Sequence, residues 1–270
     1  MSMFNVTEKV KEQYSDDKNL SIRMNLHQKY SVNKQGFLPW LFDKYEFFDG
    51  CRILELGCGN GGQWENQIDN LPNKYSLTLS DFSEGMIEIV REKFAAYKKI
   101  SFQQIDIQNI PFPDEFFDII IANHMLYHIP DLSKALSEVK RTLGNGGKFY
   151  SGAPGNGGMY LFLHNVMKRF NPNTKAFAQE LSFNLQNGAS ILAGYFSNVK
   201  RLDYKDSLSI TETQDLINWI NSAMPMAENS AEENSIIENS IALFEYFEDI
   251  RQKKGAIDIP KETGLFISTK

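Results

Sequence analysis

The amino-acid sequence predicts an α/β protein whose sheet is mostly parallel and covered by helices on both faces. Between residues 51 and 151, short apolar stretches alternate with stretches whose apolar side chains recur at helical spacing. The first apolar stretch runs directly into a cluster of glycines, as expected for a strand that ends in a tight turn. Strict alternation of strand and helix favours parallel strands, because each helix returns the chain to the same end of the sheet.

The elements of this block follow in order. Five stretches rich in aliphatic residues are expected to be strands: 51–56, 75–80, 100–105, 117–122 and 148–151. Three stretches with helical spacing are expected to be the connecting helices: 61–70, 83–98 and 131–143. Asp131 is a typical N-cap residue for the third helix. Ligands of such sheets bind at the carboxyl ends of the strands, so a site is expected in the loops that follow them.

Four segments are expected along the chain. They are an N-terminal helical cap segment at 1–48, a ligand-binding core at 49–152, a helical lid insertion at 153–197 and a last section at 198–270. Within the lid, 155–170 and 176–196 are expected to be mostly helical. The last section is expected to hold the final two strands, near 199–210 and 264–268, with a helical insertion at about 211–254.

The composition excludes several classes of protein. The 270 residues include 28 basic and 34 acidic side chains, and the formal net charge of −6 argues against binding to a phosphate backbone. Cys51 and Cys58 are too few for a disulfide scaffold and form no paired zinc motif. The first residues show no apolar signal core, and no stretch approaches the about 20 apolar residues of a membrane span. We expect a soluble cytoplasmic protein with no membrane contact and no metal.

The strongest local motif is Ile53-Leu-Glu-Leu-Gly-Cys-Gly-Asn-Gly-Gly62, whose glycines also satisfy a dinucleotide-binding pattern. Three acids at successive strand ends decide between cofactors: Glu55, Asp81 and Asp106. A carboxylate beside a pyrophosphate is electrostatically unfavourable, whereas it is favourable beside a ligand with cationic ammonium and sulfonium groups. No lysine or arginine lies among the glycines. S-adenosylmethionine fits this charge pattern better than NAD, and an NAD(P) oxidoreductase is the weaker alternative.

With these residues in view, the sequence resembles the class I S-adenosylmethionine-dependent methyltransferases of the ubiquinone-methylase-like, small-molecule kind. Further motifs in the family's order and spacing carry the resemblance: Leu79-Ser-Asp-Phe-Ser-Glu-Gly-Met86, Gln104 to Asp118, Ala122-Asn-His-Met-Leu-Tyr-His-Ile-Pro-Asp131, Arg141-Thr-Leu-Gly-Asn-Gly-Gly147 and Thr263 to Lys270. The resemblance implies a Rossmann-like, doubly wound, seven-stranded and mostly parallel sheet with an antiparallel last strand, plus a helical cap. It implies S-adenosyl-L-methionine as cofactor and S-adenosyl-L-homocysteine as product.

The resemblance also implies roles for residues around the methionine part of the cofactor. Glu55 would orient the glycine loop and act through water on the methionine ammonium. Gly57, Cys58 and Gly59 would make close backbone contacts, with Cys58 as a small packed residue and not a nucleophile. Asn123 occupies the position whose backbone carbonyl usually receives the ammonium group.

On the nucleoside side, the resemblance implies that Asp81 accepts hydrogen bonds from the ribose hydroxyls. Phe82 and Met86 would flank the adenine. Asp106 would accept from the adenine amino group, and the Ile107 amide would donate to a ring nitrogen.

An N-terminal helix often supplies a side chain to the methionine carboxylate in this family. Tyr30 is the expected residue, with Arg23 and Lys34 as alternatives and a packed aromatic residue as the structural interpretation.

Methyl transfer depends mainly on in-line placement of the nucleophile and exclusion of water, although a base can assist a hydroxyl or ammonium acceptor. His128 is the candidate catalytic base, since it matches a histidine common in the family. His124 and His164 are alternatives, and each of the three can instead be a structural hydrogen-bonding residue. A metal site would need a further ligand that the sequence does not offer.

The chain is rich in aromatic residues, with 20 Phe, 11 Tyr and 3 Trp. Many lie outside the motif-bearing block, in the segments expected to form the cap, where they either fill a core or line an acceptor pocket. The predicted function is therefore methyl transfer to O, N or C of a small, partly apolar or aromatic molecule. The alternatives are a methyltransferase acting on tRNA or protein, and a non-catalytic S-adenosylmethionine-binding module. The oligomeric state is left open.

Overall fold

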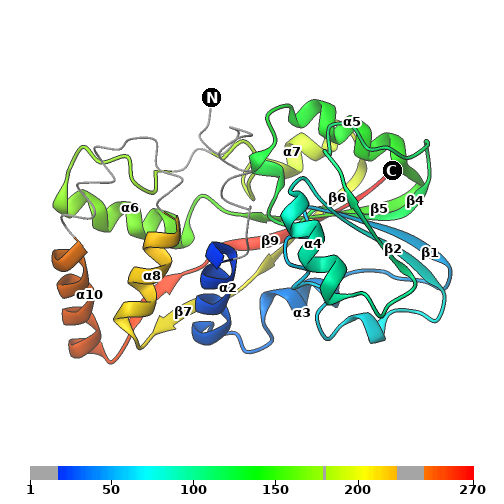
Figure 1. The fold of residues 1–270 in the computed structure, drawn as a ribbon. Coiled ribbons are helices and arrows are strands. Elements are labelled where there is room, and N and C mark those ends of the chain that lie inside the picture. The colour runs from blue at the N-terminus through cyan, green and yellow to red at the C-terminus, as the bar shows by residue number, and fades with distance from the viewer. Residues whose placement is uncertain (1–17, 179–180, 224–239) are drawn as a thin grey trace.

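The computed structural model describes residues 18–178, 181–223 and 240–270, and it is built around one seven-stranded sheet (Figure 1). The strands lie in the order β3-β2-β1-β4-β5-β9-β6. Their bounds are β1 Cys51–Leu56, β2 Tyr75–Asp81, β3 Ile100–Gln104, β4 Phe117–Ile121, β5 Leu143–Pro154, β6 Ser197–Tyr204 and β9 Thr263–Thr269. The first five strands pair in parallel, and β9 runs antiparallel to both β5 and β6, so the predicted fold class is confirmed.

Helices cover both faces of this sheet because its strands alternate between two apolar cores. On β1, Leu54 and Leu56 point to the face covered by α5 (Leu132–Thr142) and α7 (Gly188–Ala193). Cys51 and Ile53 point to the opposite face, which is covered by α3 (Phe37–Phe42) and α4 (Glu84–Lys93). A strand buried on both faces in this way is typically a run of apolar residues, and residues 51–56 follow this pattern except at Arg52 and Glu55.

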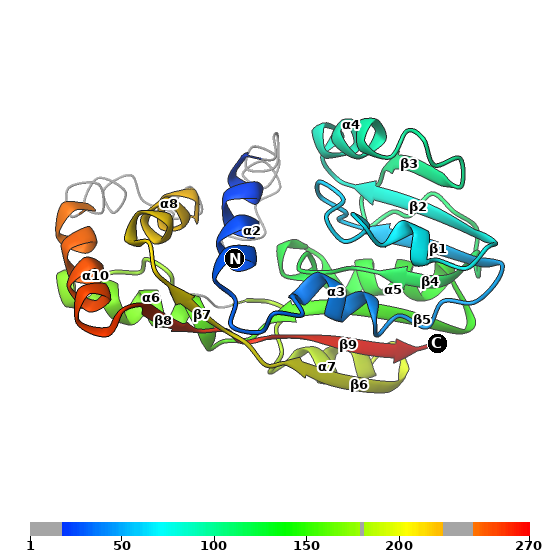
Figure 2. The same cartoon turned by 90° about the horizontal axis from the view of Figure 1, so that it is seen from below.

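A second group of elements lies beyond one end of the sheet, and we call it the cap. It contains the helices α2 (Lys18–Tyr30), α6 (Gly158–Phe170), α8 (Thr213–Ala223) and α10 (Ser240–Lys254) and the paired strands β7 (Ser207–Ile210) and β8 (Ile257–Pro260). These elements share one apolar cluster, separate from the two cores of the sheet. In both views α2 lies between the sheet and the rest of the cap (Figures 1 and 2).

The cap is attached through a long antiparallel ribbon. Strand β6 continues into β7 and β8 continues into β9, each after a two-residue break (Figure 2). At the break, Lys261 Nζ contacts Asp206 Oδ2 at 2.6 Å, and the two side chains are 9% and 0% exposed. The same carboxylate accepts from Ser31 Oγ at 2.8 Å and from the amide of Asn33 at 2.9 Å. These hydrogen bonds attach the segment after α2 to the ribbon at the break between its strands.

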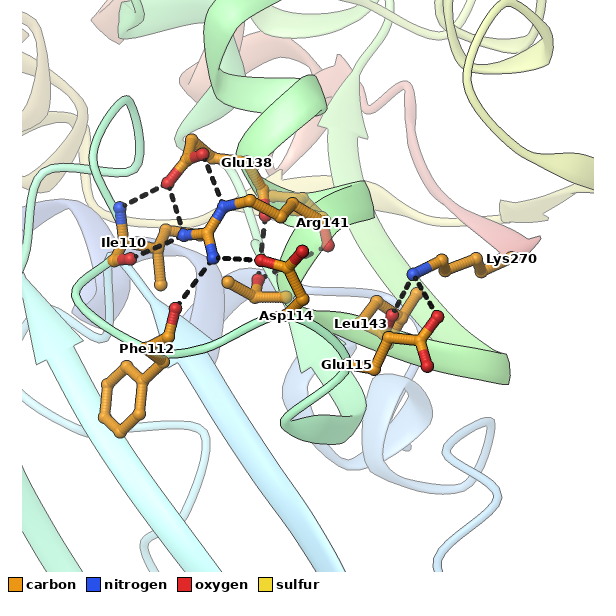
Figure 3. A network of polar contacts seen from close by, with 10 residues as sticks. Ile110, Phe112, Asp114, Glu115, Glu138, Arg141, Leu143 and Lys270 are labelled. Atoms are coloured by element: carbon orange, nitrogen blue, oxygen red, sulfur yellow. Dashed lines mark hydrogen bonds and ion pairs between the residues drawn. The ribbon is translucent and has the colours of Figure 1, made fainter.

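A second polar network holds the turn that precedes β4 (Figure 3). The Arg141 guanidinium on α5 donates to the carbonyls of Ile110 at 2.9 Å and Phe112 at 2.8 Å. It also pairs with Glu138 and Asp114. The arginine lowers the pKa of the Glu138 carboxyl, which accepts from the Ile110 amide as well. This network positions the chain that leaves the end of β3.

Two local expectations are wrong, and two further features were not foreseen. Residues 61–70 form successive turns and a short 3-10 helix, η2 (Ile68–Asn70), because Asn66 takes the left-handed conformation at φ 62° and interrupts the helical path. Residues 176–196 contain only the six-residue α7 within their described part. Strand β8 was not expected. The lid segment 153–197 divides, since α6 packs in the cap whereas the stretch around Phe183 and Leu192 packs on the sheet.

None of the helices in the described residues combines the length and apolar character needed to span a bilayer.

Candidate functional site

The loops after β1 and β2 meet because these two strands are parallel neighbours in register, with Leu56 opposite Ser80. The Asp81 carboxylate accepts from the amides of Gly59 and Ser83, each at 2.9 Å. Burial raises the pKa of Asp81, and these amides partly oppose the rise. The glycine loop and the acid of β2 are thus one preformed unit, and a carboxylate oxygen can still accept from a ribose hydroxyl.

Glu55 lies beneath this unit, with 2% of its surface exposed. Trp64 Nε1 donates to its Oε2 at 2.5 Å, and the charge of Asp81 is nearby. Burial raises the pKa of Glu55 to about 7, despite the indole hydrogen bond that lowers it. A buried carboxyl with so high a pKa gains stability from a cation, and the ammonium of S-adenosylmethionine is such a cation.

The glycine loop accepts no larger residue where α4 and α2 press on it. At Gly61, φ is 75° and a Cβ would lie 2.5 Å from Phe94 Cε2. At Gly59, φ is 53° and a Cβ would lie 3.2 Å from Leu20 Cδ2 of α2. Burial raises the pKa of the Cys58 thiol well above its ordinary value, so this thiol is neutral, as expected for a packed residue.

The loop after β3 is near the same unit, since the Ile105 amide donates to the Asp81 carbonyl at 3.0 Å. Asp106 accepts from the Gln108 amide at 2.9 Å and from its side chain at 3.1 and 3.2 Å. Ile107 and Met86 are buried. Phe82 is partly exposed, and its carbonyl accepts from Gln104. The predicted nucleoside-side residues therefore gather at the ends of β2 and β3, and their contacts with adenine stay predictions.

Asn123 joins the ends of β4 and β5. Its side chain donates to Tyr45 Oη at 2.7 Å and accepts from the Gly152 amide at 3.1 Å. The next amide, that of His124, donates to the Gly152 carbonyl at 2.9 Å. Asn123 is thus held at the end of β4 by partners that the sequence did not reveal, Gly152 and the buried Tyr45, and its contact with the methionine ammonium stays a prediction.

Tyr30 lies elsewhere. Its hydroxyl donates to Asp215 Oδ2 of α8 at 2.7 Å, and its ring packs in the cap cluster. Arg23 Nε donates to the Asn19 carbonyl, and Lys34 Nζ donates to the Ser31 carbonyl at 2.8 Å. Leu20 and Met24, by contrast, are the α2 residues that reach the glycine loop. The role of Tyr30 toward a carboxylate thus remains a prediction that its contacts in this structure do not favour.

The histidines differ in their surroundings. His128 is in the short 3-10 helix η3 (Leu126–His128) with its ring 4.4 Å from that of Tyr127. His124 has φ 52°, and its Nε2 lies 3.1 Å from Thr263 Oγ1. Burial and Lys261 lower the pKa of His124 to about 4, so it is neutral near pH 7. His164 Nδ1 lies 2.8 Å from the Ala176 carbonyl, within the cap. Among the described residues no group of three potential ligands could hold a metal.

Sequence reasoning missed Trp64, which holds Glu55, and His27, which follows Leu20 and Met24 along one face of α2. The spacing of Leu20, Met24 and His27 at positions i, i+4 and i+7 could have indicated that they share one face of a helix.

Comparison with known proteins agrees with this geometry. Residues 54–151 match the family model of the methyltransferase domain. The chain is 30% identical over 125 residues to sterol 24-C-methyltransferase ERG6B of Gibberella zeae, covering 46% of this chain and 30% of that protein. It is 33% identical over 98 residues to demethylmenaquinone methyltransferase of Staphylococcus epidermidis, covering 36% of this chain and 41% of that enzyme. The chain thus spans less than half the length of these curated relatives.

Solved structures share the fold. Phosphoethanolamine N-methyltransferase 2 of Haemonchus contortus, in complex with S-adenosyl-L-methionine, has a TM-score of 0.60 and 16% identity, covering 99% of this chain and 60% of that one. The [4+2]-cyclase SpnF has a TM-score of 0.58 and 14% identity, covering 97% of this chain and 94% of that one. From the matched domain and the strand-end acids together, the chain carries a class I S-adenosylmethionine-dependent methyltransferase domain.

Proposed function

We propose that the protein transfers the methyl group of S-adenosylmethionine to an O, N or C atom of a small, partly apolar or aromatic molecule. The observation that carries this proposal is the preformed unit of Glu55, the glycine loop and Asp81. A buried carboxyl suits a cationic methionine, and an acid at the end of β2 suits ribose hydroxyls. A Glu55 carboxylate would repel a pyrophosphate, so this residue disfavours NAD as the cofactor.

The residues would divide the work in a simple way. Glu55 and the end of β4 would hold the methionine part, and Asp81 and Asp106 would hold the nucleoside. With the cofactor bound, the reaction is an in-line displacement in which the sulfur–methyl bond breaks as the bond to the acceptor atom forms. The chain contributes orientation and a site from which water is excluded.

The acceptor would lie between the strand ends and the cap. The ring of Phe37 contacts those of His124 and Tyr204 with centroids 5.2 and 5.3 Å apart, so this region is strongly aromatic. The names of the relatives point the same way, since sterols and demethylmenaquinone have large apolar bodies. His128 and His124 are the candidates for assisting loss of a proton. A small molecule is favoured over nucleic acid by the net charge of −6.

As to compartment, we propose the cytoplasm. Cys51 and Cys58 are both free and buried, which suits a reducing environment.

Calorimetry with S-adenosylmethionine, S-adenosylhomocysteine and NAD tests the cofactor. We expect binding of the two adenosyl ligands, and tight binding of NAD alone would overturn the proposal. Incubation with methyl-labelled S-adenosylmethionine and separate pools of small metabolites, tRNA and protein tests the acceptor. Label in the small-molecule pool supports the proposal; label confined to tRNA or protein overturns the acceptor class, and binding without transfer to any pool indicates a non-catalytic module.

A further inference from the structure

Two buried nitrogen atoms in the cap have no hydrogen-bond partner among the described residues. They are Nδ1 of His27 on α2 and Nε1 of Trp219 on α8. The two rings contact each other, with centroids 6.5 Å apart and planes at 86°. Burying a polar atom without a partner is unfavourable, so two adjacent cases call for an explanation.

The face of α2 that carries His27 also reaches the glycine loop, through its earlier residues. Leu20 and Met24 of α2 lie against Gly59 and Gly62, and His27 follows them on the same face of the helix. Tyr30, on the neighbouring face, packs into the cap. His27 therefore lies where the face directed at the glycine loop meets the face directed at α8.

The described surroundings of these two atoms are strongly aromatic. The Trp219 ring contacts Tyr160 at 5.6 Å and Phe177 at 6.4 Å between centroids, and these two rings contact each other at 6.0 Å. Trp219 is 2% exposed. The nearby charged side chains form two separate ion pairs, Lys261 with Asp206 and Lys29 with Asp215.

The protonation state of His27 limits the chemical groups that can bind at this place. Burial, followed by the charges of Lys261 and His124, lowers the pKa of His27 to about 3, so its imidazole is neutral at physiological pH. The indole nitrogen can only donate, whereas a neutral imidazole nitrogen without a proton can only accept. In the tautomer that carries its proton on Nε2, His27 accepts at Nδ1, and a hydroxyl is an uncharged group that can accept from the indole and donate to this imidazole nitrogen.

This inference rests on the proposed function and makes its substrate class specific. We propose that Nε1 of Trp219 and Nδ1 of His27 bind a hydroxyl group of the methyl acceptor, whose aromatic body packs against Tyr160 and Phe177. The acceptor is thus a hydroxylated aromatic compound, held by the cap at a group separate from the cofactor-binding residues.

Phenol, toluene and benzaldehyde are probes that share one ring and differ in the group it bears. Each is titrated into protein saturated with S-adenosylhomocysteine, and the indole N–H signal of Trp219 is followed by NMR. The signal is assigned by its loss in Trp219→Phe. We expect phenol to shift it and to bind about tenfold more tightly than toluene, as one added hydrogen-bonding group implies. Equal affinities, no shift with phenol, or a preference for benzaldehyde would overturn the hydroxyl assignment.

Two histidine variants separate binding from a structural role. His27→Phe removes an unpartnered nitrogen, so we expect unchanged or higher thermal stability together with loss of the phenol preference. His164→Phe removes a nitrogen that contacts the Ala176 carbonyl, so we expect lower stability and an unchanged preference in protein that still folds. A fall in the stability of His27→Phe, with the preference retained, would mean that His27 only supports the cap. Calorimetry with S-adenosylhomocysteine on the same samples tests the proposed function separately, because cofactor binding does not use these two atoms.

Discussion

Replacing Glu55 with glutamine should change how folding stability depends on pH. In the folded protein burial raises the pKa of Glu55 to about 7 from an ordinary value of 4.5. The folded state therefore binds more protons than the unfolded state between these pH values, and stability falls as pH rises through this window. A shift of this size corresponds to a loss of about 3 kcal/mol by pH 8, when the carboxylate is charged and buried without a ligand.

Glu55→Gln keeps the shape and the hydrogen bond from Trp64 but cannot ionise. We expect its free energy of unfolding to match that of the wild type near pH 4.5 and to exceed it by about 3 kcal/mol at pH 8. Urea unfolding of both ligand-free proteins at several pH values measures this difference. S-adenosylhomocysteine should bind the variant more weakly, because its ammonium loses a carboxylate partner. Parallel pH curves for the two proteins would refute the assignment of a buried, raised pKa.

Three further variants test other parts of the structure. Asp81→Ala should weaken S-adenosylhomocysteine binding by about 1.5–3 kcal/mol in calorimetry. Asp69→Ala, at an exposed site, is the control and should bind as the wild type does. Equal affinities of the two variants for S-adenosylhomocysteine would mean that the ribose lies elsewhere. Arg141→Met should lower the free energy of unfolding by about 1–3 kcal/mol, since the Ile110 and Phe112 carbonyls lose their donor, and Lys140→Met serves as the exposed control. Lys261→Met should lower the free energy of unfolding by about 3–5 kcal/mol in denaturant, because the buried Asp206 carboxylate loses its counter-charge. Adding Asp206→Asn to this variant should restore part of the lost stability. Unchanged stability of Lys261→Met would show that the ion pair does not stabilise the attachment of the cap.

The shared fold does not by itself identify a reaction. The neighbours of similar overall shape include both an N-methyltransferase and a [4+2]-cyclase. The argument for methyl transfer therefore depends on the matched domain and on the acids at the strand ends. The argument for the acceptor depends on the cap, whose elements lie outside the matched residues 54–151.

The motif-bearing block was predictable because its signals are local. Residues 51–56 are buried on both faces, Asp131 accepts from the Lys134 amide as an N-cap, and Asp81 directly ends its strand. Residues 61–70 failed as a helix because the turn at Asn66 interrupts the path while Trp64 is held on Glu55, and spacing alone reveals neither constraint. Residues 176–196 failed because their apolar side chains pack individually against the sheet and the cap, so their spacing reflects these surfaces and not a helical face.

The sheet, the glycine loop and the acids at the ends of β1, β2 and β3 follow from the sequence alone, because each depends on neighbouring residues and on the common direction of parallel strands. Which distant side chains meet depends instead on the tertiary structure. It placed Tyr30 on Asp215, gave Glu55 its indole partner, fastened the bend of the ribbon with Lys261 and Asp206, and set His27 beside Trp219. Apart from Glu55 and Trp64, which are nine residues apart, these contacts join residues far apart in the chain, and no local pattern encodes which partners the packing brings together.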